Sequence, residues 1–443
     1  MAAASDKARF YLEQYVPELR EYESKGIFSR DEIASITSKR SEFEHTLNAR
    51  GSSPGDYVRY ATYEMNLHAL RKKRCRRLGI KSSSFSGQRT VFFVLDRATK
   101  KFPGDLALWM QYINFCKKEK ANKKLAKVFT SLLRLHPKEY GLWVLAAKHY
   151  AETQADMATA RNYMQRGLRF CKEDLKLWLE YLKLEMLYLA KIAARRKILG
   201  LDEKHEQEVD EDENIITLPS ITADDLEPAS DDENAKKGVE EVNEDLIKRL
   251  ENAPAFTGGI PIAIFDSAMK QLGSKASEAA ENFFDLISTF NQVPSASRIL
   301  DHILDWLRQN ASSSIETIIC EAKRELFSVD STSAHFPPAL SKSLARIKSG
   351  STRLQDKQQP ALSEKAVFFL VPLVENTDDM DEDIRKVLET SVKRHLRATS
   401  ATPRKPGGQK SGPEVIATAL QNQGKQQQAG QVLRLAADAG VKR

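Results

Sequence analysis

The chain has 443 residues and a formal net charge of +7, from 68 Lys and Arg against 61 Asp and Glu. Hydrophobic residues make up 41% of the sequence, which is too many for a wholly disordered chain. The longest apolar run, Ala366–Val374, is well short of the ~20 residues that a membrane-spanning helix needs. The four cysteines form no CxxC pair, which excludes a zinc ribbon and argues against a disulfide framework. We therefore expect a soluble protein of a reducing compartment, without a membrane partner.

Tryptophan is distributed periodically in the first half of the chain. Three tryptophans recur with separations of 34 and 35 residues: Trp109, Trp143 and Trp178. Prolines precede the first two by six residues, at Pro103 and Pro137, and tyrosines follow the first and third by three, at Tyr112 and Tyr181. Six residues before the third tryptophan stands Lys172, a departure from the pattern. A period near 34 residues is typical of helical-repeat proteins.

Between these tryptophans, apolar residues recur with the period of short amphipathic helices. The expected helices are Leu108–Cys116 followed by Leu125–Leu135, and Leu142–Tyr150 followed by Ala160–Phe170. Helices this short are unstable alone and must bury their apolar face against neighbours. We therefore predict an all-α solenoid of paired helices, in which the repeated aromatic residues belong to the core and do not form a base-stacking platform.

One version of the repeat contains a carboxylate. Trp178, Tyr181 and Glu185 stand at positions i, i+3 and i+7, and Tyr57, Tyr60 and Glu64 have the same spacing. The tetratricopeptide pattern has Gly four residues after the tryptophan, and this chain never does. The motif instead resembles the HAT (half-a-tetratricopeptide) repeat, a family found in RNA-processing assemblies.

The amino-terminal segment narrows the resemblance. A helix beginning near Tyr11 is expected to end at Lys25-Gly26, and Ser29-Arg-Asp-Glu32 reads as a capping box that opens the next one. With the motif at Tyr57 and the basic run that follows it, residues 6–200 resemble the amino-terminal domain of the U3 small nucleolar RNA-associated protein 6 family. The resemblance implies a HAT-repeat subunit of the UtpB subcomplex in the small-subunit processome, located in the nucleus and nucleolus. It implies WD-repeat β-propeller subunits, U3 small nucleolar RNA and pre-ribosomal RNA as partners.

Charge is distributed unevenly along the chain. Residues 201–245 contain 18 Asp and Glu against 3 Lys, a local charge of −15. Such a segment has too little apolar surface to offset the entropy of ordering, and we expect a flexible spacer there. The expected organisation is an N-terminal helical domain with a degenerate first repeat and a basic segment (1–88), HAT repeats (89–200), the acidic linker (201–245), C-terminal helical repeats (246–400), a flexible linker (401–413) and a terminal helical pair (414–443).

The second half of the chain also has helical periodicity. Helices are expected near Ile262–Leu272, Glu278–Phe290 and Ser295–Leu307. Residues 331–359 are rich in Ser and Lys and predict a loop with one short helix. A helix beginning near Ser363 is expected to end early, at Pro372.

Six cations within seven residues follow the motif at Tyr57: Arg71, Lys72, Lys73, Arg74, Arg76 and Arg77. Cations in such number can neutralise several phosphates of RNA without reading its sequence. They can equally contact an acidic protein surface, complement the carboxyl end of a helix, or serve as a nuclear localisation signal. All these interpretations remain open from the sequence.

No motif for chemistry is present. The sequence has no P-loop, no His-Glu-x-x-His and no Gly-x-Ser-x-Gly. We therefore expect no enzyme, no cofactor, no metal site and no small-molecule substrate. The favoured hypothesis is a non-enzymatic scaffold that supports U3-linked processing of pre-ribosomal RNA and maturation of 18S RNA. The alternatives are a HAT-repeat adaptor of splicing or polyadenylation machinery, and a direct RNA-binding protein.

Overall fold

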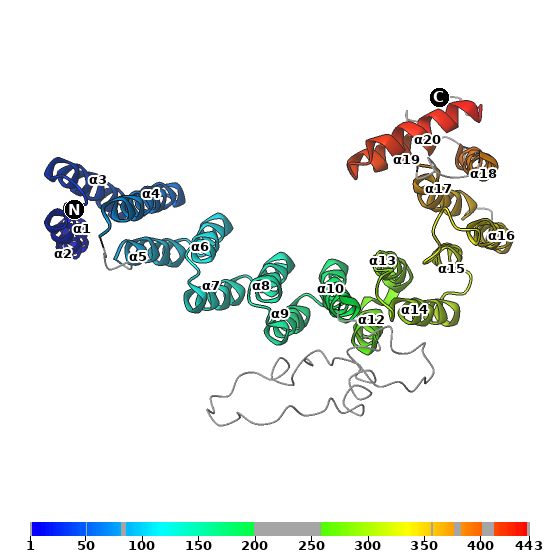
Figure 1. The fold of residues 1–443 in the computed structure, drawn as a ribbon, viewed down its shortest axis with the longest axis horizontal. Coiled ribbons are helices and arrows are strands. Elements are labelled where there is room, and N and C mark those ends of the chain that lie inside the picture. The colour runs from blue at the N-terminus through cyan, green and yellow to red at the C-terminus, as the bar shows by residue number, and fades with distance from the viewer. Residues whose placement is uncertain are drawn as a thin grey trace, which may run out of the picture. The chain divides into compact units, whose positions relative to one another are not determined.

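A computed structural model describes residues 2–49, 51–80, 86–198, 258–355, 358–375, 382–400 and 412–440. Within these ranges every regular element is a helix, which confirms the predicted all-α, HAT-like helical-repeat class (Figure 1). The acidic segment 201–245 and nearly all of the predicted linker 401–413 lie outside the described residues. The chain forms two compact units, Met1–Leu142 and Trp143–Arg443.

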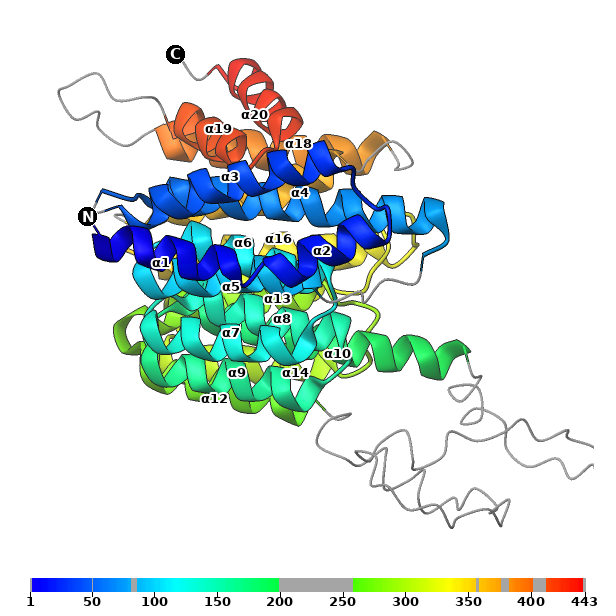
Figure 2. The ribbon, with the colours of Figure 1, turned by 90° about the vertical axis from the view of Figure 1, so that its left-hand side faces the viewer.

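In its described residues, the first unit contains seven helices and the start of an eighth. They are α1 (Ala2–Glu13), α2 (Val16–Ser24), α3 (Arg30–Asn48), α4 (Pro54–Leu78), α5 (Ser86–Lys101), α6 (Leu106–Lys118) and α7 (Asn122–Leu135), followed by the first residues of α8 (Tyr140–Thr153). Each helix packs against its neighbour in the chain or the next one along, and Figure 2 shows α3 and α4 lying side by side. Such local packing is what a repeat array requires.

The second unit continues the same construction. After α8 come α9 (Met157–Phe170), α10 (Leu175–Ile198), α12 (Gly259–Leu272), α13 (Ala276–Ser288), α14 (Ala296–Asn310), α15 (Ile315–Glu325), α16 (Phe336–Arg353), α17 (Gln359–Glu375), α18 (Glu382–Ser400), α19 (Gly412–Asn422) and α20 (Gln426–Asp438). Helix α10 packs directly against α12 and α13. The acidic segment is therefore an insertion between two packed helices of one unit.

Packing defines the compact units, whereas the expected ranges were defined by composition and motifs. The boundary between the units, at Leu142, lies inside the range 89–200, and α4 packs against α5 across the expected boundary at residue 88. Composition changes at the acidic segment, whereas packing continues from α10 to α12.

Local sequence signals explain where several helices begin and end. Ser29 and Glu32 form the predicted capping box of α3: the Glu32 amide donates to Ser29 Oγ at 3.3 Å and the Ser29 amide donates to Glu32 Oε2 at 2.9 Å. Helix α4 ends at Gly79, whose φ of +65° is accessible to glycine at little cost.

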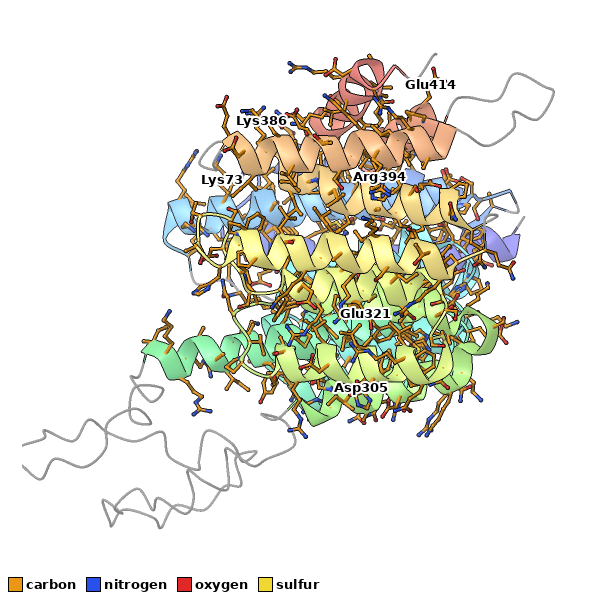
Figure 3. The ribbon with its side chains drawn as sticks, turned by 90° about the vertical axis from the view of Figure 1, so that its right-hand side faces the viewer. Lys73, Asp305, Glu321, Lys386, Arg394 and Glu414 are labelled. Atoms are coloured by element: carbon orange, nitrogen blue, oxygen red, sulfur yellow. The ribbon has the colours of Figure 1, made fainter. Side chains whose placement is uncertain are left out.

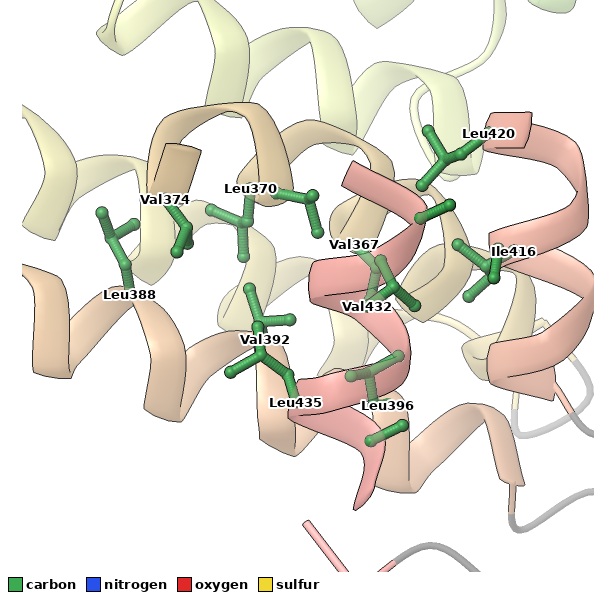
Figure 4. Packing of buried hydrophobic residues seen from close by; sticks show 14 of the residues in the cluster. Val367, Leu370, Val374, Leu388, Val392, Leu396, Ile416, Leu420, Val432 and Leu435 are labelled. Carbon is green, nitrogen blue, oxygen red and sulfur yellow. The ribbon is translucent and has the colours of Figure 1, made fainter. Parts of the chain in front are cut away.

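The core of the carboxyl-terminal helices follows the helical period. Helix α17 contributes Val367, Leu370 and Val374, and α18 contributes Leu388, Val392 and Leu396, at intervals of three or four residues. Figure 4 shows these side chains meeting Ile416 and Leu420 of α19 and Val432 and Leu435 of α20. Burial of these apolar faces is what holds the four helices together.

Two expectations for the second half were wrong. Residues 331–359 contain α16, an 18-residue helix, where a loop with one short helix was expected. Its two prolines, Pro337 and Pro338, lie in the first turn, where a missing amide donor is tolerated. Pro372 lies inside α17 and does not end it, because the buried residues Val371 and Val374 continue the apolar face past the proline.

Candidate functional site

The carboxylate of the amino-terminal HAT-like motif, Glu64, is buried and forms an ion pair inside the protein. Tyr57, Tyr60 and Glu64 are all buried on α4. Arg40 of α3 donates from Nε to Glu64 Oε1 at 2.7 Å and from Nη2 to Oε2 at 2.9 Å, and both side chains are only 1% exposed. Burial acts to lower the pKa of Arg40, but the attraction and hydrogen bonds of Glu64 outweigh it and raise that pKa. The pair is a charged clamp between two helices.

The third tryptophan repeat has the same clamp. Arg161 of α9 donates from Nε to Glu185 Oε1 at 2.7 Å and from Nη2 to Oε2 at 2.8 Å. The arginine precedes the glutamate by 24 residues, as Arg40 precedes Glu64. Glu185 is 2% exposed and Arg161 is 27% exposed, so this clamp lies nearer to solvent.

The repeats without a clamp lack both of its members. Cys116 and Tyr150 stand where the glutamate is expected, and Phe92 and Ala126 stand 24 residues before them. Loss of only one partner would leave a buried charge unpaired, which is costly. A repeat is therefore expected to have both residues of the clamp or neither of them. The sequence contains this signal as a spacing of 24 residues, which no single motif reveals.

Lys172 can replace proline six residues before the third tryptophan because only its backbone carbonyl is used. The Trp109 indole donates from Nε1 to the Pro103 carbonyl at 2.9 Å, and the Trp178 indole donates to the Lys172 carbonyl at 2.9 Å. In both repeats the acceptor lies six residues before the tryptophan. Because the bond uses the backbone, lysine supplies the same acceptor as proline.

The other predicted repeat residues also lie in the interior. The hydroxyl of Tyr112 donates to Asp96 Oδ1 at 2.6 Å, and the hydroxyl of Tyr181 accepts from Gln165 Nε2 at 3.4 Å, in each case 16 residues back. All three tryptophans are 4–6% exposed. Pro137 is partly buried in the turn after α7. These residues are positioned to hold helices together and do not present rings to solvent.

Trp143 requires a small residue beside it. A Cβ atom at Gly167 of α9 would lie 2.8 Å from Cγ of the Trp143 indole. The ring also stacks on Phe170, with centroids 5.8 Å apart and an interplanar angle of 15°. Gly167 is therefore a packing residue, which the sequence motifs do not reveal.

Three of the six predicted contact cations contribute to the fold of the first unit. Arg71 is only 2% exposed, with its guanidinium 5.9 Å from the centre of the Tyr22 ring. Arg74 donates two hydrogen bonds of 2.7 Å to Glu32, which lowers the pKa of that carboxyl to about 2, helped by the Ser29 amide. Lys72 is exposed, and its Nζ lies 2.5 Å from Oε2 of Glu119.

The remaining three, Lys73, Arg76 and Arg77, are exposed on the last turns of α4. Among the described residues, none of them forms an ion pair. Figure 3 shows the Lys73 side chain directed outward from the helix. We call these three residues the basic edge; it is the part of the predicted contact segment that remains available to a partner.

Other classes of site are not found in the described part of the chain. No group of three or more His, Cys, Asp or Glu residues there is placed to hold a metal ion. None of the helices described is long and apolar enough to cross a membrane.

Comparison with known proteins finds two family models that match the amino-terminal half of the chain. Residues 12–92 match the family model described as U3 small nucleolar RNA-associated protein 6, and residues 94–205 match the model described as PRP39 N-terminal HAT repeat. The matches begin within α1 and run past the end of α10, which covers both clamps.

Curated relatives carry the same family name. U3 small nucleolar RNA-associated protein 6 of Schizosaccharomyces pombe is 40% identical over 199 residues, which are 44% of this chain and 41% of that protein. The human homologue is 33% identical over 190 residues, 42% of this chain and 32% of that protein. The Dictyostelium discoideum homologue is 29% identical over 287 residues, 64% of this chain and 46% of that protein. The chain thus aligns with less than half the length of each of these relatives. Over its first 205 residues, this chain is therefore similar to U3 small nucleolar RNA-associated protein 6 and to the PRP39 N-terminal HAT repeat.

Proposed function

We propose that this chain is a non-enzymatic scaffold of U3 small nucleolar RNA-linked ribosome biogenesis, acting within UtpB in the small-subunit processome. The observation that supports the proposal is that the residues matched by the family models include the HAT-like motifs whose side chains pack inside the repeats. The charged groups of the HAT-like motifs form bonds between helices, as Arg40 and Glu64 do, and are not gathered in a reactive site. A helical repeat of this kind offers long exposed helix faces to partners.

Under this proposal the partners are WD-repeat β-propeller subunits, U3 small nucleolar RNA and pre-ribosomal RNA, and the location is the nucleus and nucleolus. Depletion of the protein in cells tests it. Loss of 18S RNA with accumulation of its precursors, and unchanged mRNA splicing and polyadenylation, is the expected result. Normal 18S levels beside defective splicing or polyadenylation would favour the adaptor of mRNA processing instead.

A second candidate function is direct RNA binding through the basic edge. Lys73, Arg76 and Arg77 are its support, because they are exposed and form no ion pair in the described part of the chain. Three cations neutralise few phosphates, so the contact would be weak, salt-dependent and without sequence preference. It would add to the scaffold role and not replace it.

A further inference from the structure

A hollow of about 480 Å³ lies in the second unit between α16 and α18. Its apolar lining consists of Leu344 and Ala345 from α16 and Val387 from α18. Val387 is 51% exposed, which is high for a large aliphatic residue on a packed helix. We call this hollow the α16–α18 groove.

Cations flank the apolar lining from both helices. Lys348 comes from α16, and Lys386 and Arg394 come from α18, where they lie eight residues apart on one face. Figure 3 shows Lys386 and Arg394 along the same helix. All three are exposed, and no lining residue is Asp or Glu.

The neighbouring charges leave the groove positive. Lys386 lies 3.8 Å from Glu382 and 3.6 Å from Asp383, but these carboxylates are 87% and 95% exposed, so the pairs are weak. Within the described residues, Lys348 and Arg394 form no ion pair. His395 also lines the groove; burial, with Arg394 beside it, lowers its pKa to about 4, so it is neutral near pH 7.

The lining identifies the chemistry of the occupant. Single-stranded RNA is commonly held by aromatic side chains that stack on bases, and none of the lining residues is Phe, Tyr or Trp. An amphipathic helix instead needs an apolar groove for one face and opposite charges for its flanks. Hydroxyls of Ser351, Thr390 and Ser391 add hydrogen-bonding groups along the rim.

We propose that the α16–α18 groove binds an acidic amphipathic segment of a partner protein, with its apolar stripe on Leu344, Ala345 and Val387. Its carboxylates pair with Lys348, Lys386 and Arg394. The groove shares no residue with the basic edge or the matched amino-terminal segment, so its test is separate from that of the proposed function.

The experiment is a fluorescence-anisotropy titration of the full chain with a labelled synthetic helix that carries one leucine stripe flanked by glutamates. The variant Lys348→Ala/Lys386→Ala/Arg394→Ala is expected to bind the peptide at least tenfold more weakly and with a smaller dependence on salt. Val387→Ser tests the apolar contact and is expected to weaken binding several-fold. The control Lys270→Ala/Lys342→Ala/Arg353→Ala removes three exposed cations of the same unit outside the groove.

Circular dichroism first verifies that each variant keeps its helical content. Equal peptide binding by the groove and control variants, or no peptide binding by the parent chain, would overturn the proposal. A labelled oligouridine provides the other arm. Binding of this RNA that is stronger than that of the peptide, and lost only in the groove variant, would show an RNA site and also overturn it.

Discussion

Arg40 and Glu64 form a two-pronged ion pair in which both side chains are only 1% exposed, and Arg161 and Glu185 repeat the pairing at the same separation of 24 residues. The first pair is buried on both sides, whereas the arginine of the second is 27% exposed. Buried pairs and exposed pairs respond differently to the loss of one partner, because an unpaired buried charge cannot regain its hydration.

Glu64→Ala is expected to destabilise the first unit strongly, by about 3–5 kcal/mol, since it leaves Arg40 buried and unpaired. Hydrogen exchange of the α3 and α4 amides measures the effect locally, with Arg161→Ala as the comparison in the second unit. The double variant Arg40→Met/Glu64→Leu should recover most of the loss, because it removes both charges. Equal protection in the single and double variants would show that the pairing is not what matters.

Gly167→Ala is expected to destabilise the second unit by about 1–3 kcal/mol, because its Cβ would lie 2.8 Å from the Trp143 ring. Gly430→Ala is the matched control: it lies within α20 in the same unit, and a Cβ there meets nothing within 4 Å. The control should stabilise α20 by up to about 1 kcal/mol through helix propensity. Thermal unfolding of the two variants gives the comparison, and similar shifts in both would contradict the close packing at Trp143.

The carboxyl-terminal helices are expected to lose stability between about pH 6.5 and pH 4. His395 has an ordinary pKa of 6.5 and a folded-state pKa lowered to about 4 by burial and by Arg394. The unfolded chain therefore binds more protons in this window, so the stability from His395 is complete above pH 6.5 and is lost as the pH falls to 4. Hydrogen exchange of α17 and α18 against pH measures it, and His395→Leu should flatten the profile. A parallel profile in the variant would assign the effect to other groups.

Removing the basic edge is expected to leave the fold intact. Lys73→Ala/Arg76→Ala/Arg77→Ala should reduce any RNA retention and its salt slope, since each phosphate contact contributes about 0.7 to the slope for a single strand. Lys118→Ala/Lys123→Ala/Lys127→Ala changes the charge equally at exposed positions of the same unit. Identical salt slopes for both variants would rule out a special role of the edge.

Arg71 and Arg74 are expected to behave differently from that edge. Arg74→Ala removes two hydrogen bonds to Glu32 and the stacking of the guanidinium on Phe28, whose ring centre lies 4.7 Å away. Both charged groups are near solvent, so the loss should be about 1 kcal/mol or less. Arg71→Ala should cost more because Arg71 is buried. Denaturant unfolding measures both losses, and an Arg71→Ala variant as stable as the parent would contradict this placement.

The sequence was informative where a signal repeats along the chain. The spacing of Trp109, Trp143 and Trp178 indicated paired helices, because each repeat must bury one large ring against the next. The burial of individual cations could not be predicted from the sequence, in which Arg71 and Lys73 look alike. In the fold, Arg71 is buried beside Tyr22 and Lys72 pairs with Glu119, whereas the basic edge stays exposed. Helix α16 was missed because its sequence is rich in Ser and Lys, which are also common in loops.

Membership of the U3-linked machinery is tested most directly by affinity purification of the tagged protein from cells, with its RNA sequenced and its proteins identified by mass spectrometry. The scaffold account predicts recovery of U3 small nucleolar RNA, pre-ribosomal RNA and WD-repeat proteins, both for the parent chain and for the variant without the basic edge. Recovery of splicing or polyadenylation subunits without ribosome precursors would contradict it.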